Sequence, residues 1–341
     1  MTCLASALGA GQARVCQADN YVDGMEAYRK AWAAYETQHY AEARQWADRA
    51  IRADAANPHA YALRGDLDYL AHDLRGAKTS WERALALEPR LRPLAQRLAQ
   101  LAQEQVLEAG QVAHAEDLFV IRTPAEASLQ IDASSVLREL RAAQTFLETQ
   151  LQYRLQGPIS VLVYPPSAFY GGLHVPTAVA GLFDGTVRLP AQTGPGMPST
   201  KAVLWHELTH AAVHQMAKSH APRWVHEGVA QVAQAQVEAL GHEALAIAAS
   251  RNELPSIAQL EGRADVIGDA VPMQAGLFYQ ASWAHAQYLV DHAGWTGLRR
   301  FLLALGEGAS TTDALARVTN QREDRWDREW RRWVKALMDA P

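Results

Sequence analysis

The sequence predicts an α+β protein that is mainly helical, with helical hairpins first and a domain containing a small sheet after them. Alanine-rich segments repeat at a spacing of 34 residues near the N-terminus, and short β-branched and aromatic runs follow after Gly110. Helical patterns dominate the last third. The chain has 341 residues, of which 49% are hydrophobic and 20% are charged. At roughly 100–200 residues per domain, this length favours two domains.

The N-terminal helices carry the repeat. The segment Ala43–Ala50 aligns with Ala77–Ala84, 34 residues later. The second copy resembles the tetratricopeptide consensus at its aromatic, glycine, small–aromatic–small and closing proline positions, which are Tyr61, Gly65, Ala77, Trp81, Ala84 and Pro89. A helix over about 92–109 is expected to cap the pair, and a plain helical bundle is the alternative. The resemblance implies a face for a protein partner, or for docking onto the rest of the chain.

Composition and the N-terminus limit the classes of partner and location. The net charge of −5 and the pI of about 6.2 lack the basic excess of a nucleic-acid-binding chain. No window approaches 18 uninterrupted apolar residues, so a transmembrane segment is not expected. Residues 1–20 are interpreted as a flexible tail or the remnant of an export signal. Localisation therefore stays open: periplasmic or secreted if a signal was present, otherwise cytoplasmic.

Short strands are expected in the region after the repeats. Residues 117–123 and 158–164 are β-branched and aromatic runs, and each is stopped by proline. Residues 178–190 are expected to form a hairpin or bulged edge strand that turns at an Asp-Gly pair. A helical pattern over 133–155 lies between the first two runs, and Ser199 is a good N-cap for the helix that comes next.

That next helix contains the motif His206-Glu-Leu-Thr-His210. Residues four apart lie on one helix face, so two imidazoles can point at one tetrahedral ion while Glu207 faces the adjacent position. The motif predicts His206 and His210 as zinc ligands and Glu207 as the general base. Cys3 and Cys16 both lie near the N-terminus, so a metal elsewhere must be held by histidines and carboxylates.

A catalytic zinc needs a third protein ligand. The metzincin arrangement would need histidine where Met216 stands. A second helix, opening near Pro222 and returning antiparallel, would bring Glu227 beside the two histidines, which is the gluzincin arrangement. His226 is expected to point away from that face. Gln231, four residues after Glu227, could accept the N–H of a ligand imidazole.

Together these motifs carry a family resemblance. The helix motif and the segment Arg223–Ala230 look like those of the peptidase MA-like gluzincins, and the likeness covers about residues 117–338. The resemblance implies a zincin-like domain in which an edge strand over the motif helix pairs with an extended peptide substrate. It also implies that Tyr279 stabilises the oxyanion, with a core aromatic as the equally weighted alternative. The expected domains are 21–115, tetratricopeptide-like, and 117–341, the peptidase.

The sequence thus predicts a zinc metallopeptidase, with endopeptidase action favoured because no exopeptidase signature is seen. The zinc would lower the pKa of a water whose proton Glu207 accepts. The main alternative is a non-catalytic zinc-binding scaffold that acts through its repeats, and a pro-region or chaperone-like module is a further one. A structural zinc site needs no base beside its ligands, so Glu207 argues against the scaffold.

Overall fold

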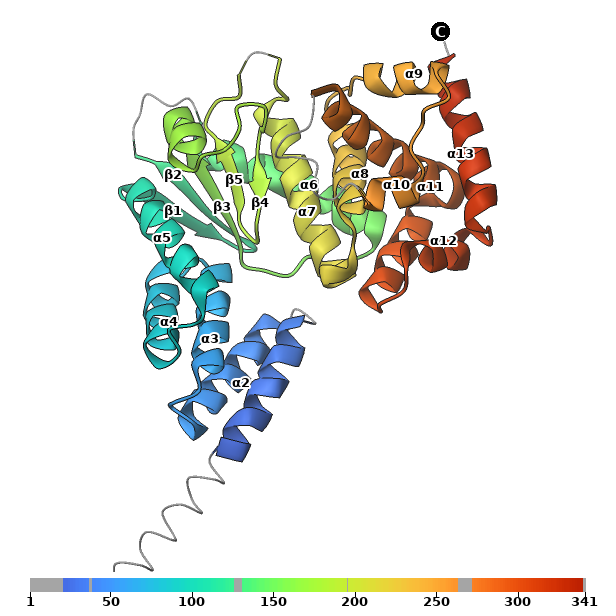
Figure 1. Ribbon diagram of the computed structural model, residues 1–341. Coiled ribbons are helices and arrows are strands. Elements are labelled where there is room, and N and C mark those ends of the chain that lie inside the picture. Colours follow the sequence, from blue (N-terminus) through green and yellow to red (C-terminus); the bar gives the residue numbers. More distant parts are fainter. Residues whose placement is uncertain (1–20, 37–38, 126–130, 195, 263–271, 340–341) are drawn as a thin grey trace, which may run out of the picture. The chain divides into compact units, whose positions relative to one another are not determined.

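The computed structural model describes residues 21–36, 39–125, 131–194, 196–262 and 272–339 (Figure 1). The chain divides into two compact units, Met1–Ala109 and Gly110–Pro341. The sequence places the start of the second domain at about residue 117, whereas the second unit already contains a strand before that position. This strand, Gln111–Glu116, was missed because five of its six residues are exposed and show no alternating hydrophobic pattern.

The described part of the first unit is helical. Consecutive helices pack against each other, and Asn57 and Asp73 cap two of them by accepting hydrogen bonds from backbone amides in the first turn. The helices cover residues 21–36, then α2 (Tyr40–Ala53), α3 (Pro58–Leu70), α4 (Leu74–Leu87) and α5 (Arg92–Leu107).

Small residues in the first unit lie where helices approach closely. A Cβ added to Gly65 would lie 2.2 Å from Cδ1 of Trp81, so the tryptophan fills the space that this glycine leaves. Ala77 and Ala84, on either side of Trp81 in the sequence, are fully buried. The 34-residue spacing therefore coincides with the helix contacts. It marks the packing surface of the hairpins.

The second unit contains a five-stranded mixed sheet with the strand order β1-β2-β3-β5-β4. The three central strands are parallel, and the two edge strands are antiparallel to their neighbours. The expected hairpin is confirmed, because β4 and β5 turn at Asp184–Gly185. The strands are β1 (Gln111–Glu116), β2 (Phe119–Pro124), β3 (Ile159–Tyr164), β4 (Leu182–Phe183) and β5 (Val187–Pro190). The predicted α+β class, mainly helical with a small mixed sheet, is confirmed.

Helix α7 (Thr200–Ala217) lies between the sheet and the other helices of this unit (Figure 1). It contacts α6 (Ala133–Leu151), β4 and β5, and also α8 (Arg223–Gln234) and α11 (Pro272–Gly306). Ser199 caps it by accepting a hydrogen bond from the Ala202 amide, as predicted. Because it has neighbours on several sides, α7 is buried along most of its length.

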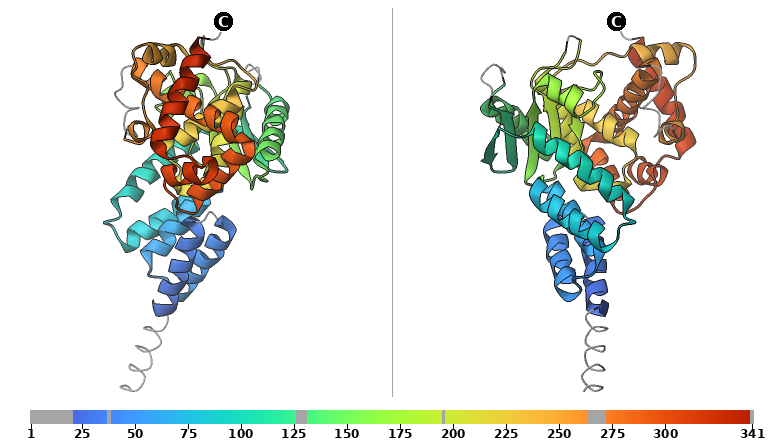
Figure 2. Two further views of the ribbon diagram at one scale, coloured as in Figure 1. Left: turned by 90° about the vertical axis from the view of Figure 1, so that its right-hand side faces the viewer. Right: turned by 60° about the vertical axis from the view of Figure 1, so that its left-hand side comes forward.

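Helices α9 to α13 complete the second unit and lie on the side of α7 away from the sheet (Figure 1), and they form one cluster, coloured orange to red, in the views of Figure 2. Helix α11 changes direction at Gly294, whose φ of 69° is the left-handed conformation that glycine adopts readily. No helix among the described residues is both long enough and apolar enough to cross a bilayer. The shorter helices are α9 (Glu243–Ser250), α10 (Ile257–Glu261), α12 (Thr311–Thr319) and α13 (Glu323–Met338).

Candidate metal centre

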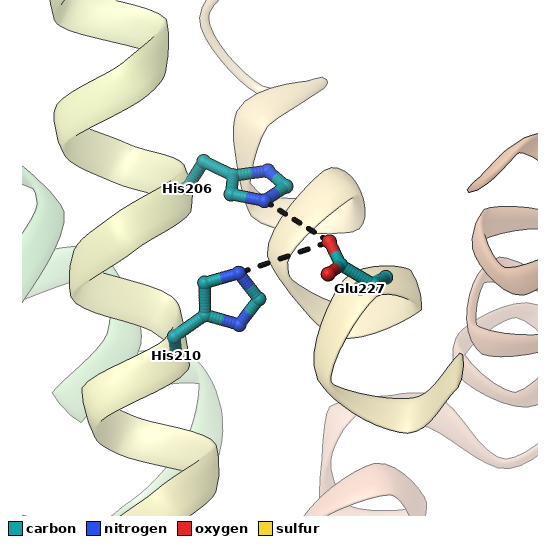
Figure 3. A group of neighbouring side chains, drawn as sticks. All are labelled: His206, His210 and Glu227. Carbon is teal, nitrogen blue, oxygen red and sulfur yellow. Dashed lines mark ion pairs between the residues drawn. The ribbon is translucent and has the colours of Figure 1, made fainter. Parts of the chain in front are cut away.

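The three predicted metal ligands come together between α7 and α8 (Figure 3). Oε2 of Glu227 lies 3.4 Å from Nε2 of His206 and 3.8 Å from Nε2 of His210. One ligand atom from each residue lies within 4.8 Å of the other two. The structure therefore brings Glu227 to the two histidines across a turn of the chain, as the sequence predicts.

This arrangement fits a zinc ion. Ligand atoms about 2.0–2.2 Å from a tetrahedral zinc lie roughly 3.3 Å from one another. Both contacts of Glu227 with the histidines are near that separation. Two imidazoles and a carboxylate also match the ligand chemistry of catalytic zinc sites. The side chains are 11–16% exposed, so the group is largely shielded from water while keeping an opening.

A hydrogen bond fixes the orientation of His206. Its Nδ1 lies 2.9 Å from Oε1 of Gln234, the last residue of α8. An amide oxygen is an acceptor, so Nδ1 carries the proton and Nε2 keeps its lone pair for a metal. The sequence suggested that Gln231 could accept the N–H of a ligand imidazole, and at His206 the acceptor is Gln234 instead. Gln234 follows Glu227 by seven residues, which is two helical turns and returns the side chain to the same face of α8.

The electrostatics of the group favour a charged Glu227 carboxylate and act in opposite directions on the two histidines. Burial by itself would raise the pKa of Glu227, but His206, His210 and Arg223 outweigh it and lower that pKa to about 2. Burial lowers the pKa of His210 to about 3, so this imidazole is neutral over the physiological range. Burial would also lower the pKa of His206, but its contact with Glu227 and the charge of Glu207 outweigh burial and raise that pKa, so this imidazole takes up a proton more readily than His210 while no metal occupies Nε2.

Glu207, which follows His206 on α7, is buried in the same region. Its side chain is 5% exposed, and burial raises its pKa to about 7, assisted by the negative charges of Glu227 and Asp184. The backbone just before β4 runs directly against it: a Cβ added to Gly181 would lie 2.7 Å from the Glu207 Oε1 atom. The edge hairpin thus lies over the motif helix, in agreement with the zincin-like expectation.

Tyr279 reaches the same region from α11. Its hydroxyl oxygen lies 3.5 Å from Nη2 of Arg223. Burial, together with the nearby charge of Glu227, raises its pKa to about 12. The phenol therefore stays protonated at neutral pH and has a hydrogen to donate. Tyr279 also packs against the hydrophobic core, so it combines a core contact with a hydroxyl that lies near the charges of Glu227 and Glu207.

Two further histidines lie beside the ligands. The rings of His226 and His210 have centroids 5.8 Å apart, so His226 lies beside the ligand histidine although it is not in the group of possible metal ligands. The ring of Phe183, from the edge strand, stacks on His210 at 6.4 Å and meets His214 edge-on at 6.1 Å. Aromatic contacts therefore link β4 to the motif helix, a feature that sequence spacing alone could not reveal.

A family model for the Peptidase MA superfamily matches residues 149–336, which is more than half of the chain. The match includes the two motif helices, the edge hairpin and α11. A comparison with curated proteins gave no match. Peptidases of this superfamily are typically metal-dependent, in agreement with the His-His-Glu group. The chain therefore belongs to the Peptidase MA superfamily.

Proposed function

We propose that this protein is a zinc-dependent metallopeptidase of the gluzincin type, with endopeptidase action, in which His206, His210 and Glu227 hold the zinc. The observation that carries the proposal is the convergence of these three side chains beside the buried Glu207. Family membership supports a peptidase that acts on peptides or proteins. A structural zinc site would have no use for a buried carboxylate at this position.

The chemistry divides between the ion and the chain. A bound zinc would supply Lewis acidity and make an attacking water more acidic. Glu207, with a pKa of about 7, is suited to accept the proton of that water and to return it to the leaving amine. Tyr279 would donate a hydrogen bond to the carbonyl oxygen as negative charge develops there. Gln234 keeps the His206 ring in the metal-binding tautomer.

The substrate is proposed to bind as an added strand. β4 is the last strand in the sheet order, pairs with β5 on one side only, and contacts α7. An extended peptide that pairs with its outer edge would pass beside Glu207. Backbone hydrogen bonds provide affinity without demanding a particular side chain. The edge therefore supports peptide substrates in general and does not select one sequence.

We also propose that the helices of the predicted domain 21–115 form a tetratricopeptide-like domain for docking a protein partner, and that the predicted domain 117–341 is the peptidase domain, extended at its start by β1. The repeat spacing and the packing of Gly65 against Trp81 support the repeat assignment. Removal of residues 21–109 is not a suitable first test, because it also removes the last helix before the sheet. The peptidase activity is better tested in the full chain.

The first test measures zinc content and cleavage of a proteome-derived peptide mixture by mass spectrometry. Glu207→Gln is expected to keep one zinc per chain and to lower kcat by about 10²–10⁴-fold, since it removes the base and keeps the volume. The matched control is Glu253→Gln at an exposed position, which should leave kcat unchanged. Zinc binding at one equivalent, with no hydrolysis that depends on Glu207, would instead favour a zinc-binding scaffold.

A further inference from the structure

Arg223 lies between the proposed ligand Glu227 and the proposed oxyanion donor Tyr279. Its Nε is 3.8 Å from Oε1 of Glu227, and its Nη2 is 3.5 Å from the hydroxyl oxygen of Tyr279. The Glu227 oxygen that faces the histidines is the other one, Oε2. One guanidinium group therefore contacts both partners and leaves the metal-facing oxygen free.

The surrounding helices hold this guanidinium in place. Arg223 and Glu227 are four residues apart on α8, so their side chains lie on the same face. The guanidinium carbon lies 5.6 Å from the ring centroid of Phe278 on α11, within the range of a cation–π contact. A Cβ added to Gly228 would lie 2.2 Å from the carbonyl oxygen of Ser282. Helices α8 and α11 can therefore approach this closely only with glycine at that position.

In both contacts Arg223 supplies the N–H group, and Tyr279 and Glu227 supply the oxygen atoms. A guanidinium group donates hydrogen bonds and accepts none. When it donates to the Tyr279 oxygen, the phenolic hydrogen must point towards another acceptor. When it pairs with Oε1 of Glu227, it limits rotation of the carboxylate. A lysine ammonium is a single compact centre and does not reproduce this two-pronged geometry.

We propose that Arg223 is a positioning residue that couples the zinc ligand to the oxyanion donor. It holds Glu227 with Oε2 towards the histidines, and it holds Tyr279 with its hydrogen available to the substrate oxygen. This inference rests on the proposed function. Loss of Arg223 should therefore have two separate effects. A misplaced Tyr279 slows the chemical step and leaves substrate binding intact, whereas a misplaced Glu227 weakens zinc binding.

The kinetic test uses Arg223→Met, Tyr279→Phe and the double variant, all at saturating zinc. Each single change is expected to lower kcat by about 10–100-fold and to leave KM within about twofold, since the interaction is made in the transition state. Because Arg223 acts through Tyr279, the double variant should be no more than about threefold worse than the poorer single variant. Losses that multiply in the double variant would overturn the coupling.

The zinc test does not depend on activity. In competition with a chromophoric chelator, Arg223→Met should bind zinc about 10-fold more weakly than the unchanged chain, the usual cost of removing a residue that orients a ligand. Arg223→Lys keeps the charge and should recover zinc affinity to within about threefold, while kcat stays low. An unchanged or tighter zinc Kd in Arg223→Met would overturn the contact with Glu227.

Controls separate these outcomes from a folding defect and from failure of the proposed function. Arg138→Met changes an exposed arginine on α6 and should alter neither zinc affinity nor kcat. The urea midpoint of each variant should match that of the unchanged chain, and Arg223→Lys carries the test if the methionine variant unfolds. Hydrolysis that Glu207→Gln does not reduce would overturn the proposed function, and the zinc titration would then still decide the Arg223–Glu227 contact.

Discussion

Two groups of side chains in the second unit, one around His206 and His210 and one around His285, give their histidines opposite surroundings. His206 and His210 face the carboxylate of Glu227, and their Nε2 atoms point at a common oxygen. His285, on α11, is 1% exposed and has aromatic surroundings: its ring stacks on Trp330 at 3.7 Å, and its Nδ1 accepts a hydrogen bond from Nε1 of Trp326. The first group converges on one point, whereas the second uses its nitrogen to satisfy a buried tryptophan.

The contrast shows that burial does not by itself make a histidine functional. Burial lowers the pKa of both His210 and His285 to about 3, so the pKa does not distinguish them. Geometry does: the lone pair of Nδ1 in His285 is occupied by Trp326, and its Nε2 lies 3.5 Å from the carbonyl oxygen of Pro255. This histidine has no nitrogen left for a metal.

The largest effect on zinc affinity is expected from a substitution in the first group, and a substitution in the second group should have none. Glu227→Ala removes one of three ligands, so we expect zinc Kd to rise by at least about 10³-fold and peptide hydrolysis to be lost. His285→Ala should keep zinc at one equivalent per chain. Metal analysis after dialysis against a weak chelator measures both. If Glu227→Ala binds zinc as tightly as the unchanged chain, the assignment of the third ligand is wrong.

The sequence predicted the first group more completely than the second. Two histidines four apart on one helix have their geometry set by the helix itself, and Glu227 needed only a turn and a returning helix. Trp326 and Trp330 lie four residues apart on α13, and both are buried. Their partner His285 lies on α11, and no spacing rule indicates which residue a distant helix will place there.

The same limit explains which neighbours at the site the sequence did not indicate. Gln231 and His226 were judged by their positions on α8 alone, but the crossing of α7 and α8 decides which side chains meet. That crossing brings Gln234 to His206 and brings the ring of His226 near His210. Exposed β1 carries no alternation for the sequence to show, so the sheet was predicted without its edge. The sequence spacing within a helix predicts which of its side chains share a face, but the packing of the helices decides which residues that face contacts.

An intermediate effect on zinc affinity is expected when the hydrogen bond between His206 and Gln234 is removed. Gln234→Ala removes the acceptor for Nδ1 of His206, and we expect zinc to bind about 10–100-fold more weakly. Gln231→Ala, three residues earlier on the same helix, is the matched control and should change zinc affinity by less than about twofold. Chelator competition measures both variants. Equal losses in the two would show that Gln234 does not orient the histidine.

The smallest expected effect concerns the second group and pH. His285 has a pKa of about 3 in the folded chain, against about 6.5 for an unfolded histidine. Between these values the folded state binds fewer protons than the unfolded state. Its contribution to stability is therefore complete above about pH 6.5 and is lost as the pH falls towards 3, at about 1.4 kcal/mol per pH unit.

Replacing His285 by phenylalanine tests this directly, because the ring can still stack on Trp330 but can no longer take up a proton. Urea unfolding of the metal-free chain, followed by tryptophan fluorescence, should show a loss of stability between pH 6.5 and 5.5 that is about 1 kcal/mol smaller than in the unchanged chain, because the unfolded histidine is only partly protonated at the upper end of this interval. His220→Gln, at an exposed position, should keep the original slope. If His285→Phe keeps that slope too, His285 is already protonated in the folded chain. The description of His285 as a neutral histidine that accepts a hydrogen bond from Trp326 would then be wrong.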